Sequence, residues 1–236
     1  MGTPLINDWT IEDVNYDKKN NTLQFRVIYL NYKFHIKQME SKNHLYFLFV
    51  TPKNLKSLIF SPPFQTFLDY EYQLFTNADE FLKKTIETMM KNKWTTLGFI
   101  NQSGKNSYIG QSTGFMNQIA EVNIVKEFQG KNLCKPLIKF SIQNFMLMQK
   151  EELKTDDISI GIYMHSKMPF QACNCYIKAG LELGLYVYQS ADDESCYHRV
   201  DDVKQQCHNY KGQTDYAEGL MIIYKTVPFK RNMYCD

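Results

Sequence analysis

Residues 124–137 read IVKEFQGKNLCKPL, and this stretch decides the fold that the sequence predicts. The apolar run at residues 119–125 indicates a buried strand leading into it, and residues 133–148 carry apolar side chains at the spacing of one helical face. A strand that passes through a tight turn into a helix presents several free backbone N–H groups at one place, where the helix dipole adds partial positive charge. We therefore expect this turn to bind the pyrophosphate of a ligand.

The turn matches neither of the common nucleotide-binding loops, Gly-x-Gly-x-x-Gly and the P-loop Gly-Lys-Ser/Thr. It resembles the acyl-coenzyme A loop of the GCN5-related N-acetyltransferase (GNAT) superfamily, which reads Gln/Arg-x-x-Gly-x-Gly/Ala. The six corresponding positions are Gln129, Gly130, Lys131, Asn132, Leu133 and Cys134, of which two depart from the pattern. Asn132 replaces a Gly that usually has a positive φ, which Asn tolerates better than most residues. Cys134 replaces a Gly or Ala and is only slightly larger than Ala.

A second motif follows about forty residues later. After a predicted strand at residues 158–163, residues 169–181 read PFQACNCYIKAGL and predict a short helix that ends at Gly180. This segment resembles the superfamily pattern Asn-x-x-Ala-x-x-x-Tyr-x-Lys-x-Gly-Phe through Ala172, Tyr176, Lys178 and Gly180, whereas the leading Asn is absent and Leu181 replaces the Phe. Together the two motifs extend the resemblance over roughly residues 95–190.

The resemblance implies a mixed α/β fold of the GNAT type. Its central sheet would be mostly antiparallel with flanking helices, and it would splay between two parallel strands that end near Val125 and Tyr163. We expect this domain over residues 43–230, preceded by an N-terminal extension at residues 1–42 with strands at 23–30 and 32–39 that could form a β-hairpin. Other predicted elements are strands at residues 45–50, 95–100, 108–115, 181–188 and 219–226, and a helix at 78–91.

Composition excludes several classes of protein. The chain of 236 residues has a net charge of +2 without a basic block, which argues against nucleic acid as the main ligand. It has no apolar run long enough to span a membrane, and its N-terminus lacks the layout of a secretory signal. Six irregularly spaced cysteines are interpreted as reduced thiols, which predicts an intracellular, cytoplasmic protein. The Cys and His residues near positions 196–208 do not have the spacing of a zinc site, so no metal is expected.

The resemblance also implies the chemistry and the residues that carry it. Acetyl-CoA, or another acyl-CoA, would donate its acyl group to an amine acceptor, which could be a small molecule or a protein or peptide amine. Tyr176 corresponds to the general acid near the thioester sulfur, although it could instead be a core tyrosine. Glu121 is the one carboxylate in the strand before the loop and is the candidate base, unless strand alternation turns it away. Donor binding is assigned to Ile124, Val125 and the six loop residues Gln129, Gly130, Lys131, Asn132, Leu133 and Cys134.

Two alternatives to an acetyltransferase stay open. Residues 116–142 also resemble one half of the protein N-myristoyltransferases, which favours a long-chain acyl donor. A GNAT-fold protein without catalytic activity could instead serve as an interaction module. The long acidic segment at residues 189–218 could steer a cationic acceptor, as loops at this place border the acceptor site in the superfamily, or it could be a solvated insertion.

Overall fold

The protein is described by a computed structural model over residues 9–17, 22–29, 43–58, 61–72, 84–85, 88–89, 91–102, 105–164, 170–191, 196–201 and 220–234. Its strands are β1 (Trp9–Asp17), β2 (Thr22–Tyr29), β3 (Asn43–Val50), β4 (Trp94–Gln102), β5 (Lys105–Phe115), β6 (Gln118–Ile124), β7 (Ser159–Met164), β8 (Tyr186–Ala191), β9 (His198–Arg199) and β10 (Leu220–Lys225). Its helices are α1 (Leu55–Leu58), α2 (Pro62–Tyr72), α4 (Cys134–Leu153) and α5 (Phe170–Glu182), with the short 3-10 turns η1 (Lys126–Phe128) and η2 (Arg231–Met233).

The larger sheet has the mixed topology that the sequence predicts. Its eight strands follow the order β3-β4-β5-β6-β7-β10-β8-β9. The pair β6–β7 is parallel, whereas β7–β10, β10–β8 and β8–β9 are antiparallel. The predicted fold class, a mostly antiparallel sheet with one parallel pair and flanking helices, is therefore confirmed.

The chain divides into two compact units, Met1–Lys93 with Leu97–Gly110 and Trp94–Thr96 with Gln111–Asp236. In the first unit, β1 and β2 pair antiparallel, so β2 covers most of the strand predicted at residues 23–30. The strand predicted at 32–39 and most of the helix predicted at 78–91 lie outside the described residues. Aromatic side chains fill the unit's core, where the ring of Phe67 lies 5.5 Å from Phe64 and 5.2 Å from Tyr108. The domain boundary predicted after residue 42 stays a prediction.

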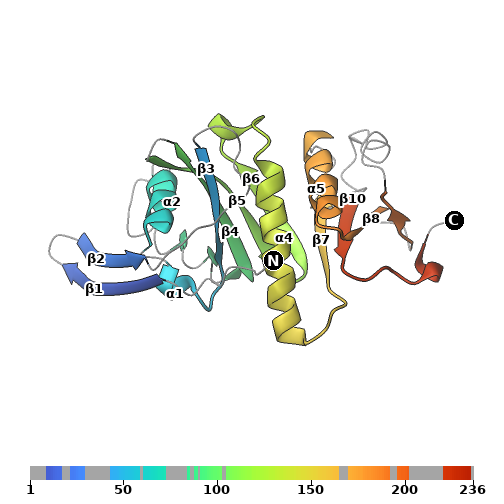
Figure 1. Cartoon of the computed structure of the whole chain (residues 1–236), viewed down its shortest axis with the longest axis horizontal. Helices are drawn as coiled ribbons and strands as arrows, with labels where there is room; N and C mark the ends of the chain where they lie inside the picture. The colour runs from blue at the N-terminus through green and yellow to red at the C-terminus, as the bar shows by residue number, and fades with distance from the viewer. Residues whose placement is uncertain are drawn as a thin grey trace. The chain divides into compact units, whose positions relative to one another are not determined.

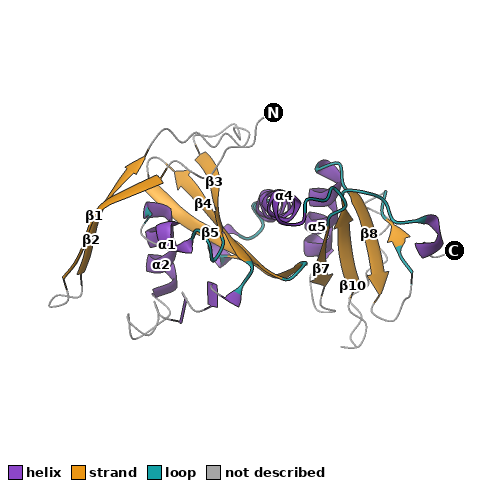
Figure 2. Ribbon diagram, turned by 90° about the horizontal axis from the view of Figure 1, so that it is seen from below, coloured by secondary structure: helices purple, strands orange, loops and turns teal. Residues whose placement is uncertain are grey.

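In the second unit, α4 and α5 pack against each other (Figure 1). Helix α5 lies along β10 and β8, which are neighbours in the sheet (Figure 2). The buried face of α4 contains most of the predicted apolar positions, and its Ser141 hydroxyl lies 3.0 Å from the Thr96 hydroxyl. No described helix is long and apolar enough to cross a membrane.

The end of α5 differs from the sequence prediction. Gly180 lies inside the helix, and the chain turns at Gly184, which has a φ of +71°. The N–H of Gly184 donates to the Leu181 carbonyl and that of Leu185 to the Gly180 carbonyl, which together form a Schellman motif. The predicted strand at 181–188 accordingly begins only at Tyr186.

Candidate active site

The two parallel strands in the middle of the sheet separate after a short stretch of pairing. β6 pairs with β7 at Gln118 with Gly161 and at Ile119 with Ile162. The described residues show no further pairing between these strands, although β6 continues to Ile124. Opposite the described residues of β7, the backbone polar groups of β6 just beyond Ile119 are therefore left to bind water or a ligand. We call this gap between the parallel strands the β6–β7 opening.

β6 is less buried than the sequence predicts. Ile119 is buried, but Val122 and Ile124 are only half-buried and the other residues of the strand are exposed. The expectation of a buried strand is therefore wrong for most of β6. Its apolar residues border the opening, where part of their surface stays uncovered, and an apolar run does not by itself distinguish such a strand from one in the core.

A short loop connects β6 to the start of α4. The side chain of Gln129 donates from Nε2 to the Ile124 carbonyl at 2.9 Å, which ties the loop to the end of the strand. Gly130 and Asn132 have φ values of +75° and +58°. Asn132 thus adopts the left-handed conformation expected at a position where the superfamily has Gly. Leu133 is buried and anchors the end of the loop.

The start of α4 has no side-chain cap. Leu133 occupies the N-cap position and makes no side-chain hydrogen bond there. Since the first turn of a helix has no intrahelical acceptors for its N–H groups, those of α4 are available to an anion. The helix has 20 residues, and its dipole places partial positive charge at this end. The start of α4 therefore combines free N–H donors with partial positive charge, and its binding of a pyrophosphate stays a prediction.

The lysines near this helix start have protein partners. Lys131 lies over the ring of Phe128, with Nζ 5.1 Å from the ring centroid. Lys135 and Lys139 both bind Glu182, the last residue of α5, at 2.5 Å and 3.0 Å. The pKa of the Glu182 carboxyl is lowered, chiefly by the hydrogen bond from Lys135; burial opposes this effect, and the hydrogen bond from Lys139 adds to it. These ion pairs join α4 to α5 on their exposed side.

Tyr176 lies in the second turn of α5 and is only 2% exposed. Burial raises the pKa of its hydroxyl to about 12. This hydroxyl has no hydrogen-bond partner in the described part of the chain. Its oxygen is not fully buried, because it is absent from the set of buried polar atoms that have no partner. The ring is thus enclosed while the oxygen can still be reached from outside.

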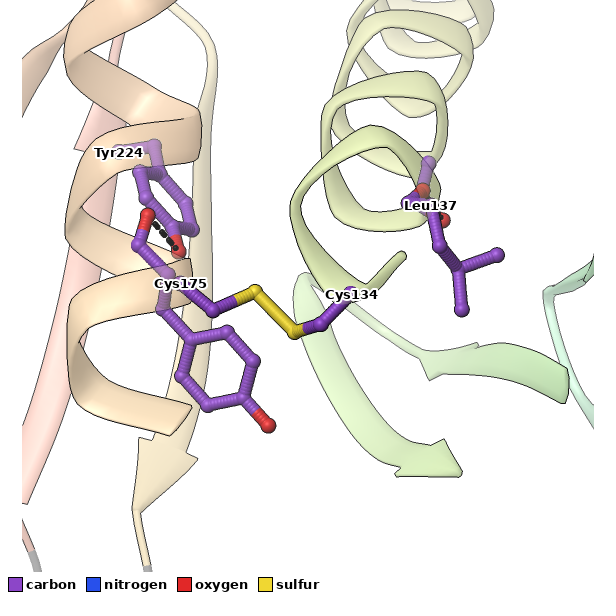
Figure 3. Close-up of a disulfide and its surroundings, with 6 residues drawn as sticks. Cys134, Leu137, Cys175 and Tyr224 are labelled. Carbon is purple, nitrogen blue, oxygen red and sulfur yellow. Dashed lines mark hydrogen bonds between the residues drawn. A yellow bond between two sulfur atoms is a disulfide. The ribbon is translucent and has the colours of Figure 1, made fainter. Parts of the chain in front are cut away.

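Tyr224 of β10 supports the turn that contains Tyr176. Its hydroxyl donates to the backbone carbonyl of Tyr176 at 3.1 Å (Figure 3). The ring fits against α5 because Gly180 has no side chain, since a Cβ there would lie 2.5 Å from the ring. Gly180 is therefore needed for close packing of the helix on the sheet rather than for ending the helix.

A disulfide joins the two helices at the opening. Cys134, the first residue of α4, is bonded to Cys175 in α5 (Figure 3). Cys173 and Cys196 are also disulfide-bonded, and no described cysteine is free. The prediction of reduced thiols is wrong, and it no longer supports a cytoplasmic location, because disulfides persist mainly in oxidising environments. Cys134 and Cys175 lie in the two sequence motifs, but neither motif alone shows that they pair.

Glu121 lies on β6 with an exposed side chain. It makes no hydrogen bond or ion pair with any described residue. It is two positions from the buried Ile119 and so lies on the same face of the strand. Its role as a base stays a prediction.

The sequence matches no protein-family model and no curated protein. Solved structures similar to the chain are acetyltransferases. One is spermidine N-acetyltransferase from Vibrio cholerae, crystallised with CoA and spermine, with 12% identity over 77% of this chain and 95% of the other and a TM-score of 0.40. Another is a probable acetyltransferase from Staphylococcus epidermidis, with 9% identity over 78% of this chain and 100% of the other and a TM-score of 0.36. At these values the likeness does not decide the activity of this chain.

Proposed function

We propose that this chain is an acyl-CoA-dependent N-acyltransferase that transfers an acetyl group from acetyl-CoA to an amine. The observation that carries the proposal is the β6–β7 opening, with the uncapped start of α4 after the first of its two parallel strands. In sheets with parallel strands, ligands usually bind beyond the carboxyl ends of the strands. The resemblance of the loop and of the α5 segment to GNAT motifs favours an acyl-CoA as the ligand.

Each part of the opening has a role in donor binding. The N–H groups at residues 130–134 would hold the pyrophosphate, since that of Gln129 donates to the Lys126 carbonyl. The edge of β6 beyond its last described pair with β7 would hydrogen-bond to the amide groups of the pantetheine arm. The half-buried Val122 and Ile124 would cover its apolar parts. Lys135 could bind a phosphate of the donor only by giving up its ion pair with Glu182.

In the reaction the amine nitrogen attacks the thioester carbonyl carbon, and the carbon–sulfur bond then breaks. The amine loses one proton, and the CoA sulfur leaves as a thiolate that must be stabilised or protonated. Glu121 is the candidate base, with a water chain or another exposed carboxylate as the alternative. Products are the N-acetylated amine and free CoA.

The raised pKa of Tyr176 defines what its hydroxyl can do for the leaving thiolate. A thiol has a pKa near 8.5, so complete transfer of a proton from a hydroxyl with a pKa of about 12 is uphill. A hydrogen bond from the neutral hydroxyl to the developing thiolate needs no transfer. We assign Tyr176 this role, in which it stabilises charge that appears only as the bond breaks.

The experiment that tests the function has two stages. Coenzyme A should raise the melting temperature of the protein, because a ligand that binds only the folded state stabilises it. Amines and peptides are then screened with acetyl-CoA and myristoyl-CoA, and turnover is followed by release of free thiol. Turnover with myristoyl-CoA alone would favour the long-chain alternative, and donor binding without any turnover would favour an interaction module. Absence of a thermal shift with millimolar CoA or acyl-CoA would reject the proposal.

A further inference from the structure

The disulfide between Cys134 and Cys175 connects the two parts of the proposed site that must act together. Cys134 begins α4, so its N–H belongs to the uncapped first turn. Cys175 precedes Tyr176 in α5. The Cα atoms lie 6.2 Å apart, although the residues are 41 positions apart in the sequence (Figure 3). The bond therefore sets the distance between the pyrophosphate-binding turn and the helix that carries the proposed thiolate stabiliser.

Other polar links between these helices are weak. Lys135 and Lys139 share the carboxylate of Glu182, and all three side chains are at least 30% exposed. Ion pairs with this exposure contribute little to stability and are screened by salt. The disulfide is thus the link at this end of α4 that neither salt nor water can weaken.

Both sulfur atoms belong to half-buried residues, whereas Cys173 in the same helix is fully buried. We therefore expect a small reductant to reach the Cys134–Cys175 bond before that of Cys173. A dithiol reductant would break it by thiol–disulfide exchange, in which two electrons and two protons pass to the cysteines and the reductant becomes a disulfide.

We propose that Cys134 and Cys175 are positioning residues for the acyl-CoA donor, and that the disulfide form is the form that binds the donor tightly. The inference rests on the proposed function and adds redox control to the same site. With the bond intact, the first turn of α4 and the Tyr176 turn are held in one arrangement. After reduction that arrangement becomes one of several, so the donor must select it from a mixture.

The test compares donor binding by the oxidised and the reduced protein. Isothermal titration calorimetry with CoA, well below the melting temperature, should give a Kd about 10-fold higher after treatment with dithiothreitol, if the competent arrangement is populated roughly a tenth of the time. The kcat at saturating donor should change less than KM for the donor. Circular dichroism of the same samples checks that the reduced protein is folded.

Two variants separate this bond from the other disulfides. Cys134→Ala/Cys175→Ala should have the Kd of the reduced wild type and should no longer respond to dithiothreitol. Cys196→Ser is the matched control, because it removes a different disulfide cysteine. Cys196 lies beside the edge strand β9, and β10 and β8 separate β9 from β7 in the sheet. This control should bind CoA with the wild-type Kd while oxidised and should still lose affinity on reduction.

The outcomes also distinguish this inference from the proposed function. If the oxidised wild type binds no CoA, the proposed function itself fails. If oxidised and reduced protein bind CoA equally, the positioning role is wrong and the proposed function stands. Peptide mapping of the unreduced protein that finds Cys134 and Cys175 unlinked would also overturn the inference. Should the double variant fail to fold, the single variants Cys134→Ser and Cys175→Ser, each of which also removes this bond, are compared with Cys196→Ser in its place.

Discussion

The β6–β7 opening and the C-terminal edge of the sheet lie in the same unit but differ in how their backbone groups are hydrogen-bonded. At the opening, strand pairing stops early and a helix begins without a cap. At the C-terminal edge, formed by β8, β9 and residues 226–234, the backbone is bonded back to the sheet, as in the bond from the Tyr197 N–H to the Met233 carbonyl at 2.9 Å. The difference indicates which part of the sheet is left for a ligand.

Aromatic rings cover the C-terminal edge. Tyr197 stacks on Phe229 with ring centroids 4.3 Å apart, and Tyr188 contacts the same ring at 4.8 Å. Lys225 is 8% exposed, binds Asp157 at 2.7 Å and lies over the Phe229 ring. Lys225 is thus satisfied within the protein, whereas the buried Oε1 of Gln189 in β8 has no hydrogen-bond partner among the described residues. The predictions below test whether the two regions differ in function as they do in bonding.

The largest effect is expected at Gly130, in the loop before α4. Gly130→Glu should abolish the thermal shift caused by CoA, since it brings a negative charge close to the pyrophosphate. Like charges placed together cost several kcal/mol, or roughly a 100-fold to 1,000-fold loss of affinity.

Gly184→Glu is the matched control for this change. Both glycines have positive φ, and a Cβ added at either one would meet open space, so the backbone strain is similar. Gly184→Glu should keep the CoA shift. Equal loss in both variants would mean that strain, not charge, is responsible.

Tyr176→Phe should lower kcat by roughly 10²-fold to 10³-fold with little change in donor affinity. This is the usual effect of removing one hydrogen-bond donor that stabilises charge in a transition state. Since the pKa of Tyr176 is about 12, kcat should not fall through ionisation of this residue below about pH 11. Steady-state kinetics against pH checks both statements, and full activity of the variant would return Tyr176 to the core.

Much of the fold could be predicted from local sequence. Alternating or continuous apolar runs placed most strands, and the Asn at position 132 was compatible with the positive φ that the structure has. These features depend on a few adjacent residues. Two motifs in the correct order then constrained the topology, including the parallel pair.

Features that depend on distant residues were missed. Gly180 and Gly184 are both suited to a helix end, and the contact of Gly180 with Tyr224 shows that the first is needed for packing instead. The bond between Cys134 and Cys175 likewise requires knowing that α4 and α5 are neighbours. The general base is likewise not identified by local sequence, since the exposed Glu121 has no partner among the described residues that would assign it this role.

Alkaline pH should destabilise the fold through buried tyrosines on the helix and sheet beneath the opening. Burial raises the pKa of Tyr176 to about 12 and that of Tyr224 well above its usual value. A raised pKa in the folded state contributes stability that is complete below pH 10 and is lost as pH rises through the folded-state value. For Tyr176 alone the two-unit difference corresponds to roughly 3 kcal/mol. Urea unfolding between pH 8 and 11.5 should detect about 2 kcal/mol of this loss, which is complete only above pH 12, and Tyr176→Phe should reduce its slope.

The smallest effect is expected at the C-terminal edge, from Tyr234→Phe. The Phe229 N–H donates to the Tyr188 hydroxyl at 3.1 Å, and the Tyr234 hydroxyl, 3.1 Å from that of Tyr188, donates to the Phe229 carbonyl at 3.2 Å. This closed set of hydrogen bonds begins and ends on one residue. Removing the Tyr234 hydroxyl leaves a carbonyl without this donor and a buried hydroxyl without this partner, which should cost about 1 kcal/mol of unfolding free energy.

Tyr234→Phe also tests the comparison of the two regions directly. If the C-terminal edge only stabilises the sheet, urea unfolding should detect the loss while the Kd for CoA stays at the wild-type value. Tyr176→Phe should show the opposite pattern, with a large loss of kcat at neutral pH and a small change in stability. A rise in the Kd for CoA in Tyr234→Phe would mean that the closed edge is coupled to the opening through β8 and β10, and the two regions would then have to be treated as one functional site.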